Sequence, residues 1–232
     1  MNKSKLKISV SLIGALVITV FWLGQGNNEK FSALPTETNP ANLPSNDYSV
    51  ATWVSNAMSV DQVVLESDLV VKARVSEAPV SRVVRAELPV WDENGNIVGS
   101  AIDEMVFSDT VFEVLDTYIG KSSLEIVVMQ TGGFEPSIST GVMQMADDPL
   151  YNLGEEYILF LNDISGDRVH ARDRMLYITV NPFGRYRIDG ENVFSYGQNL
   201  ISHGQFSQLV QLPVNIIELE AQIKQAEQKL NN

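Results

Sequence analysis

Residues 154–161 read GEEYILFL, and this stretch decides the class of fold. A short apolar run bounded by a turn residue is typical of a buried β-strand. We therefore predict that Gly154 turns the chain and that Glu155 and Glu156 lie solvated at the start of a strand. Residues 157–161 would then form the wall and core of a sheet.

The same geometry bears on chemistry at Glu155 and Glu156. Successive side chains of a strand point to opposite faces, so the two carboxylates are expected to diverge. The paired carboxylates of a glycosidase face each other across roughly 5–10 Å, which neighbours on a strand cannot do. Either residue could still act together with an acid that is distant in the sequence.

Strand patterns recur on both sides of this stretch, and 68–196 contains no long helical pattern. Turn-bounded strands at such intervals indicate a mainly β body, as in a barrel or a sandwich. The predicted strands are DLVVKARVS (68–76), an alternating region between Val80 and Thr110, VFEVLDTYIG (111–120), LEIVVMQTGG (124–133), YILFLND (157–163), MLYITV (175–180) and the hairpin RYRIDGENVFS (185–195).

Two helices flank the predicted strands. SVDQVVLES (59–67) has Ser59 as N-cap and Gln62 three residues later, the pattern of a capping box. The tail carries an apolar stripe at helical spacing, and Pro213 suits the start of that helix. We expect the tail to pack against the body, with self-association as the alternative. The stripe consists of Ile216, Leu219, Ile223, Ala226 and Leu230.

Composition restricts the classes of partner and chemistry. The net charge is −13, and because the first 27 residues hold three lysines and no acid, the remainder carries −16. An acidic body argues against nucleic acid, which requires a basic face. The chain has no cysteine, which excludes disulfides, thiol nucleophiles, thiolate metal sites and a lipoprotein anchor.

The order of elements resembles a family. The segments that carry the resemblance are ESDLVVKARV, YIGK, LEIVVMQTGG, LGEEYILFL and FGRYRIDGENV. They are similar to a group of uncharacterised membrane-anchored or secreted bacterial proteins and, more distantly, to the netrin-like module of the tissue inhibitors of metalloproteinases. The resemblance covers about residues 60–190 and implies an OB-like β-barrel. It does not imply protease inhibition, because those inhibitors place an N-terminal cysteine on the protease zinc.

These patterns divide the chain into five parts. Lysines precede an apolar run, which predicts an N-terminal signal anchor with the body outside the cytoplasm. Cleavage near Gly26, giving a secreted protein, is the alternative. The parts are a cytoplasmic basic region (1–7), a transmembrane or signal-anchor helix (8–24), a flexible tether (25–50), the OB-like β-barrel domain (51–197) and a C-terminal helical segment (198–232).

Several polar clusters were weighed as sites. Asp92, Asn94 and Asn96 have calcium-like spacing, but Ile97 replaces the required glycine and Asn94-Gly95 predicts a hairpin. His170 and His203 lack metal-ligand spacing and are expected at the surface or in turns. Three further segments are interpreted as a strand end (Thr131-Gly132-Gly133), a polar loop (136–140) and a solvated acidic loop (147–156).

We assign no catalytic, cofactor-binding or metal-ligating residue. The function expected is an extracytoplasmic, membrane-tethered binding module without catalytic activity, contacting an envelope protein or polymer and no nucleic acid. If a region binds, we favour loops 87–104 and 131–153, since loops on a rigid barrel carry most binding sites. The alternatives are an envelope-polymer hydrolase that uses loop carboxylates and a surface protein that binds divalent cations weakly.

Overall fold

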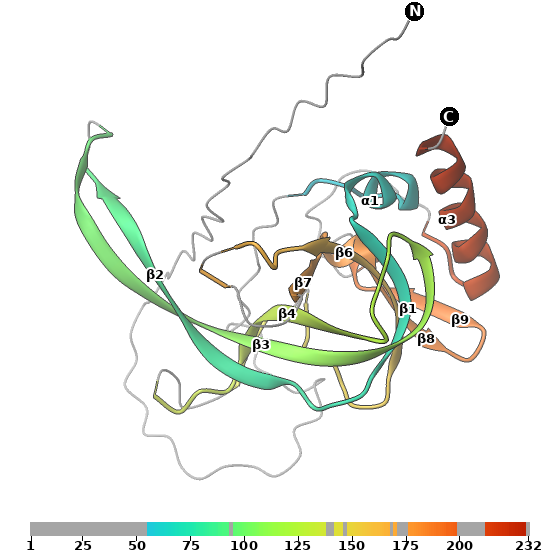
Figure 1. The fold of residues 1–232 in the computed structure, drawn as a ribbon, viewed down its shortest axis with the longest axis horizontal. Coiled ribbons are helices and arrows are strands. Elements are labelled where there is room, and N and C mark those ends of the chain that lie inside the picture. The colour runs from blue at the N-terminus through green and yellow to red at the C-terminus, as the bar shows by residue number, and fades with distance from the viewer. Residues whose placement is uncertain are drawn as a thin grey trace, which may run out of the picture.

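The computed structural model describes residues 55–92, 95–137, 142–145, 148–167, 169–170, 176–198 and 212–230. The predicted basic region, apolar helix and tether lie outside these residues. Within the described part of the chain, no helix is long and apolar enough to cross a membrane. The described residues form a mainly β body with two α-helices, as the strand patterns predicted (Figure 1).

The body begins with α1, Val60–Glu66, which the capping box starts as predicted. The Ser59 hydroxyl accepts a hydrogen bond from the Gln62 N–H, and the Gln62 side chain accepts one from the Ser59 N–H. The chain then enters β1, Leu69–Val75, whose residues are almost all buried.

The longest elements are β2, Val80–Trp91, and β3, Ile97–Ile119. They pair antiparallel in unbroken register from Val80 opposite Asp109 to Val90 opposite Gly99. The predicted hairpin at Asn94-Gly95 is confirmed, but 111–120 is not a separate strand, because β3 runs without a break from the hairpin into the body. We call residues 85–104 the arm, since this part of the ribbon extends away from the rest of the molecule (Figure 1).

Five strands hydrogen-bond in a closed ring. Around the ring β1 is followed by β3, β4, β7 and β6, and β6 pairs again with β1. The β4–β7 pair is parallel and the other four are antiparallel. The remaining ring strands are β4, Glu125–Gly133, β6, Glu156–Asp163, and β7, Leu176–Thr179. The short β5, Met143–Gln144, pairs with the end of β4.

A hairpin and a helix complete the body. The short helix η2, Pro182–Gly184, leads into β8, Arg185–Asp189, which pairs with β6, and then into β9, Asn192–Ser195.

The tail helix is α3, Ile216–Leu230. It packs against the body as predicted, with Leu219, Ile223 and Ala226 buried. Its cap is Asn215, whose side-chain oxygen accepts from the Glu218 N–H at 2.8 Å, so the helix begins after Pro213, the residue predicted at its start. Leu230, the last residue of the predicted stripe, is exposed.

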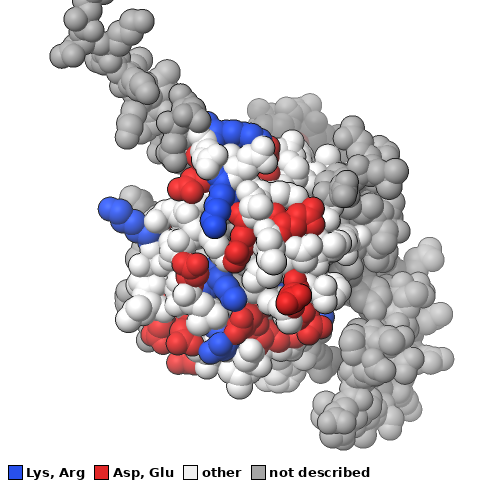
Figure 2. Space-filling view, turned by 90° about the vertical axis from the view of Figure 1, so that its right-hand side faces the viewer, with Lys and Arg blue, Asp and Glu red and all other residues white. Residues whose placement is uncertain are grey.

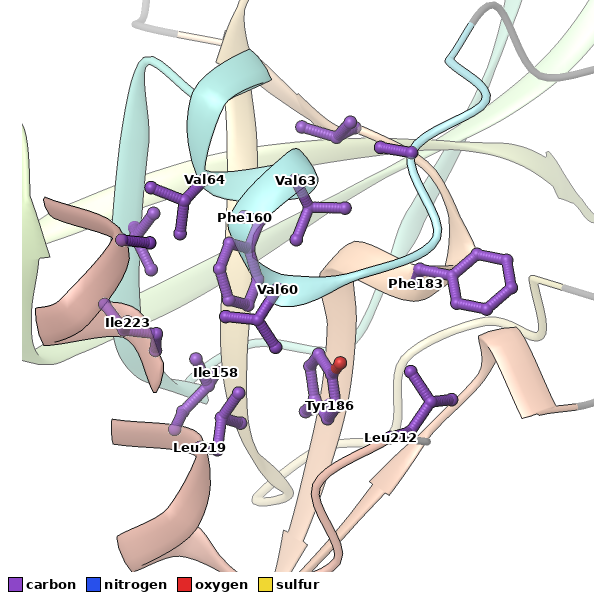
Figure 3. Close-up of a cluster of buried hydrophobic side chains, with 14 of the residues drawn as sticks. Val60, Val63, Val64, Ile158, Phe160, Phe183, Tyr186, Leu212, Leu219 and Ile223 are labelled. Carbon is purple, nitrogen blue, oxygen red and sulfur yellow. The ribbon is translucent and has the colours of Figure 1, made fainter. Parts of the chain in front are cut away.

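Buried side chains form three clusters. The first fills the ring and includes Phe112, Tyr157 and Leu159. The second lies between the outer face of the ring and the helices, where α1, α3 and β6 side chains meet (Figure 3). The third lies at the base of the arm, around Val84 and Phe107.

Candidate functional site

The Glu155–Glu156 pair stands where β6 begins, directly after a turn at Gly154 with φ of +83°. The two carboxylates diverge, as the strand geometry predicted. Glu156 binds Arg74 (Oε1 to Nη2, 2.6 Å) on the neighbouring strand β1. Glu155 accepts hydrogen bonds from the hydroxyl of Tyr157 and from Arg187, the latter at 3.4 Å.

Both carboxylates are only partly solvated, less than expected. Their side chains are only 25% and 28% exposed, and each forms ion pairs. Burial would raise the pKa of Glu155, but hydrogen bonds from Tyr157 and Asn152 and the charge of Arg187 outweigh it and lower that pKa. Glu155 is therefore ionised at neutral pH and cannot serve there as a general acid.

A shallow, open hollow lies beside Glu155, on the hairpin of β8 and β9. It is lined by Arg187, Phe194, Ser195, Tyr196 and Gln198. The guanidinium of Arg187 lies 5.6 Å from the ring of Phe194 and also forms an ion pair with Glu155, so it has two partners within the chain itself.

Beneath the hollow lies Arg185, which is completely buried. Its Nη1 donates to Asp148 Oδ1 at 2.7 Å, and Gln130 Nε2 donates to the same oxygen at 2.8 Å. The Arg185 guanidinium also lies over the rings of Tyr151 and Tyr196, 3.8 and 4.2 Å from their centroids. These contacts fasten the segment before β6 to the hairpin.

This centre corrects the prediction that 147–156 is a solvated loop, because only residues 152–154 of its described part are exposed. Asp148 and Tyr151 are both almost fully buried. Burial raises the pKa of the Tyr151 hydroxyl, so that group stays neutral at physiological pH. Asp148 balances the charge of Arg185, and the two tyrosine rings cover the guanidinium. We therefore interpret this centre as structural and call it the clamp.

The other clusters also have structural roles. Asp92 accepts from the Asn96 N–H at 2.8 Å and closes the predicted hairpin, while Asn94 lies outside the described residues. His170 lies in a turn, which is one of the two positions predicted for it. It is not a surface residue, because its side chain is only 12% exposed and contacts Asp167 at 3.1 Å. His203 lies outside the described residues.

The glycines that end β4 divert the chain. Gly132 and Gly133 both have positive φ. The Ser108 hydroxyl donates to the Gly132 carbonyl at 2.8 Å, and the Phe134 N–H donates to the Ser81 hydroxyl at 2.9 Å. The predicted strand end at 131–133 is confirmed. Of the predicted polar loop 136–140, only residues 136 and 137 are described, in a turn.

Among the described residues, no three His, Cys, Asp or Glu side chains come together in a way that could hold a metal ion. Figure 2 shows one side of the body, where acidic and basic side chains are interspersed and no continuous basic patch forms.

The arm carries five exposed large apolar residues. Scattered exposed apolar residues are ordinary, but a contiguous group marks an interaction site. Trp91, Ile97 and Ile102 are 54%, 68% and 73% exposed. Val90 and Val98 are exposed beside them.

One face of the arm is apolar apart from Asp103, which lies opposite Ala86. Residues directly opposite in an antiparallel ribbon share a face, so Leu88 lies beside Ala101 and Val90 beside Gly99. This face continues from Val84 in the third buried cluster. The opposite face is mixed, with Arg85 paired to Glu104 at 2.6 Å.

No model of a known protein family matches the chain, and a comparison with curated proteins finds no significant match.

Proposed function

We propose that this chain is an extracytoplasmic binding module, tethered to the membrane by its N-terminal segment and without catalytic activity. The arm is its binding surface, and the partner is a protein or polymer of the cell envelope. The observation that carries the proposal is the exposed apolar surface of the arm, on a ribbon whose other end is built into the closed ring.

The proposal includes an OB-like barrel as the scaffold. Numbered along the chain, the ring strands follow the order 1-2-3-5-4 and return to 1. That order, with one parallel pair between the third and fifth strands, is typical of the five-stranded Greek-key barrel of OB-type folds. It also supports the distant resemblance to netrin-like modules.

The proposed location rests on the sequence. Three lysines before an uncharged segment and an acidic body after it favour a start in the cytoplasm and a body outside. The absence of cysteine makes the test direct, because an introduced cysteine is the only thiol of the chain. In intact cells, a membrane-impermeant maleimide should label Ser100→Cys but not Ser4→Cys until the cells are lysed. Equal labelling of both in intact cells would contradict the proposed orientation.

The binding role of the arm can be tested by site-specific photo-crosslinking in intact source cells. A photoreactive amino acid would replace Ile102 on the arm or, as the matched control, Leu124, which is equally accessible in the turn before β4. We expect at least tenfold more adduct from position 102. Equal yields from the two positions would refute the arm as the binding surface.

Removing the arm gives a second test. Ala86 and Asp103 lie directly opposite each other as a hydrogen-bonded pair, so an Asn-Gly turn can join them in place of residues 87–102. We expect this variant to fold and to lose binding, with the adduct followed from a photoreactive residue at position 86. Undiminished adduct would contradict the proposal.

A further inference from the structure

The two outer edges of the arm differ. In β3 the Val114 N–H donates to the Leu124 carbonyl, on the side of β4. Backbone groups of alternate residues point to opposite sides, and the register is unbroken from Gly99 to Glu113. The N–H groups of Ser100, Ile102 and Glu104 therefore point away from β2.

None of the described strands pairs with this edge of β3 between Ile97 and Val106. β4 covers the same edge only from Phe107 onward, where Thr131 is its last paired residue. The two glycines that follow Thr131 then turn the chain toward Ser81 on β2. Within the part of the chain that the structure describes, the line along β3 that β4 would have continued is therefore open.

The edge of β2 is protected instead. By the same alternation, the N–H groups of the odd-numbered residues of β2 point outward. Pro89 is one of these odd-numbered residues, and it has no N–H to offer. Proline on an edge strand blocks the addition of another strand. The ribbon is thus closed to pairing on one edge and open on the other.

The charge of the arm specifies what fits the open edge. The arm contains five acidic residues and one basic residue, Arg85, which pairs with Glu104. Asp103 and Glu104 stand on opposite faces of the open edge, and exposed Ile102 and Val98 lie on the same face as Glu104. A second copy of this acidic chain would bring like charges together, whereas Lys or Arg would complement them.

We propose that the outer edge of β3, residues 97–106, binds an extended segment of a partner protein as an added β-strand. The segment carries Lys or Arg among β-branched or aromatic residues. Backbone hydrogen bonds to Ser100, Ile102 and Glu104 hold it, and its side chains lie along both faces of the arm. This inference rests on the proposed function of the arm and names the way in which it binds.

Hydrogen exchange of backbone amides tests the mode directly. The probe is a capped octapeptide of alternating lysine and valine, added to the full chain. In the free chain the amides of Ser100, Ile102 and Glu104 should exchange quickly. The peptide should slow them at least tenfold. An alternating glutamate–valine peptide, and a lysine–valine peptide N-methylated on its valines, should have no effect.

Two proline variants provide the matched comparison. Ile102→Pro removes an outward N–H from the open edge, and Glu87→Pro removes one from the edge of β2. Neither N–H takes part in the β2–β3 pairing, so both variants should remain folded. We expect at least tenfold weaker peptide binding for Ile102→Pro and unchanged binding for Glu87→Pro and for Ile102→Val.

The outcomes separate this inference from the proposed function. Edge amides that are already protected in the free chain would show that the chain covers its own edge, which overturns the inference. So would a lysine–valine peptide that slows no edge amide, or one whose binding survives Ile102→Pro. If crosslinking from position 102 persists in either case, the arm binds through its side-chain faces and only the strand-addition mode fails.

Discussion

The two halves of β3 belong to one strand but lie in different surroundings. From Val106 to Thr110 every residue is buried, whereas from Ile97 to Glu104 every residue is exposed. The inner half has strands on both sides, and among the strands that the structure describes the outer half pairs only with β2. Substitutions in the inner half should therefore change stability, and those in the outer half should change binding.

The largest effect on stability is expected from Arg185→Met in the buried clamp. Removing one partner of a buried ion pair costs about 3–5 kcal/mol, because Asp148 is left buried and uncompensated. Urea unfolding should show this loss. Arg187→Met, two residues along and half-exposed, should cost less than about 1 kcal/mol. Equal losses for the two variants would contradict the description of Arg185 as a clamp.

Phe112→Ala should cost nearly as much. Phe112 is fully buried in the inner half of β3 and packs edge-on against Tyr151, with ring centroids 4.8 Å apart. Truncation of a buried phenylalanine lowers the free energy of unfolding by about 3–4 kcal/mol. Ile102→Ala in the outer half should cost less than about 1 kcal/mol in the same measurement. A comparable loss at Ile102 would mean that the arm is part of the core.

Gly133→Ala tests the junction between the two halves. Gly133 has φ of +135°, and an added Cβ would lie 2.2 Å from the Ser81 hydroxyl and 2.4 Å from that of Ser108. We expect a loss of about 2 kcal/mol, seen as a fall in Tm of roughly 4–8 °C. Gly99→Ala on the arm meets open space at an ordinary φ and should leave Tm within about 2 °C. A neutral Gly133→Ala would contradict the close approach of β4 to β2.

The smallest expected effect is on the loss of stability at acid pH. The pKa of Glu155 is lowered from its ordinary 4.5, so its contribution to stability is present above about pH 4.5 and is lost as the pH falls through the lowered value. Glu155→Gln should therefore reduce the difference in unfolding free energy between pH 7 and pH 3, by less than about 1 kcal/mol because the group is partly solvated. Arg187→Met should act in the same direction. An unchanged pH dependence in both variants would count against the hydrogen bonds assigned to Glu155.

Much of the fold was predictable because its signals are local. A short apolar run after a turn residue identified the strand at 157–161, a turn-bounded strand pattern identified the hairpin at 185–195, and the capping box identified α1. Periodicity identified α3. In each case the pattern depends on residues within one or two turns of helix or one pleat of strand, so it does not depend on tertiary contacts.

The clamp could not be predicted, because its signal is not local. Arg185 and Arg187 are two residues apart on β8, so both side chains lie on the same side of the strand. Nothing in the sequence distinguishes the buried arginine from the half-exposed one. Asp148 comes 37 residues before Arg185, in a segment whose acids resemble those of a solvated loop. Only the pairing of β8 with β6 brings the two together.

The length of β3 was also beyond the sequence pattern. The pattern placed a boundary at Thr110, so the alternating region before it and 111–120 looked like separate units, whereas β3 runs through both. The predicted binding hairpin at 87–104 nevertheless coincides with the exposed arm. Its function remains a proposal, as does that of the loop at 131–153, part of which belongs to β4 and to the clamp.

The contact between α1 and α3 also determines the order in which parts of the body can fold during synthesis. Asp61 and Lys229 form an ion pair across 168 residues of sequence, and Val63 shares a buried cluster with Ile223. At a synthesis rate of about 5–20 residues per second, roughly 10–30 s separate the appearance of the two helices. During that interval the apolar face of α1 lacks its cover. The ring strands, which end at Thr179, are all made before α3, so the helical layer is the last part of the body to close.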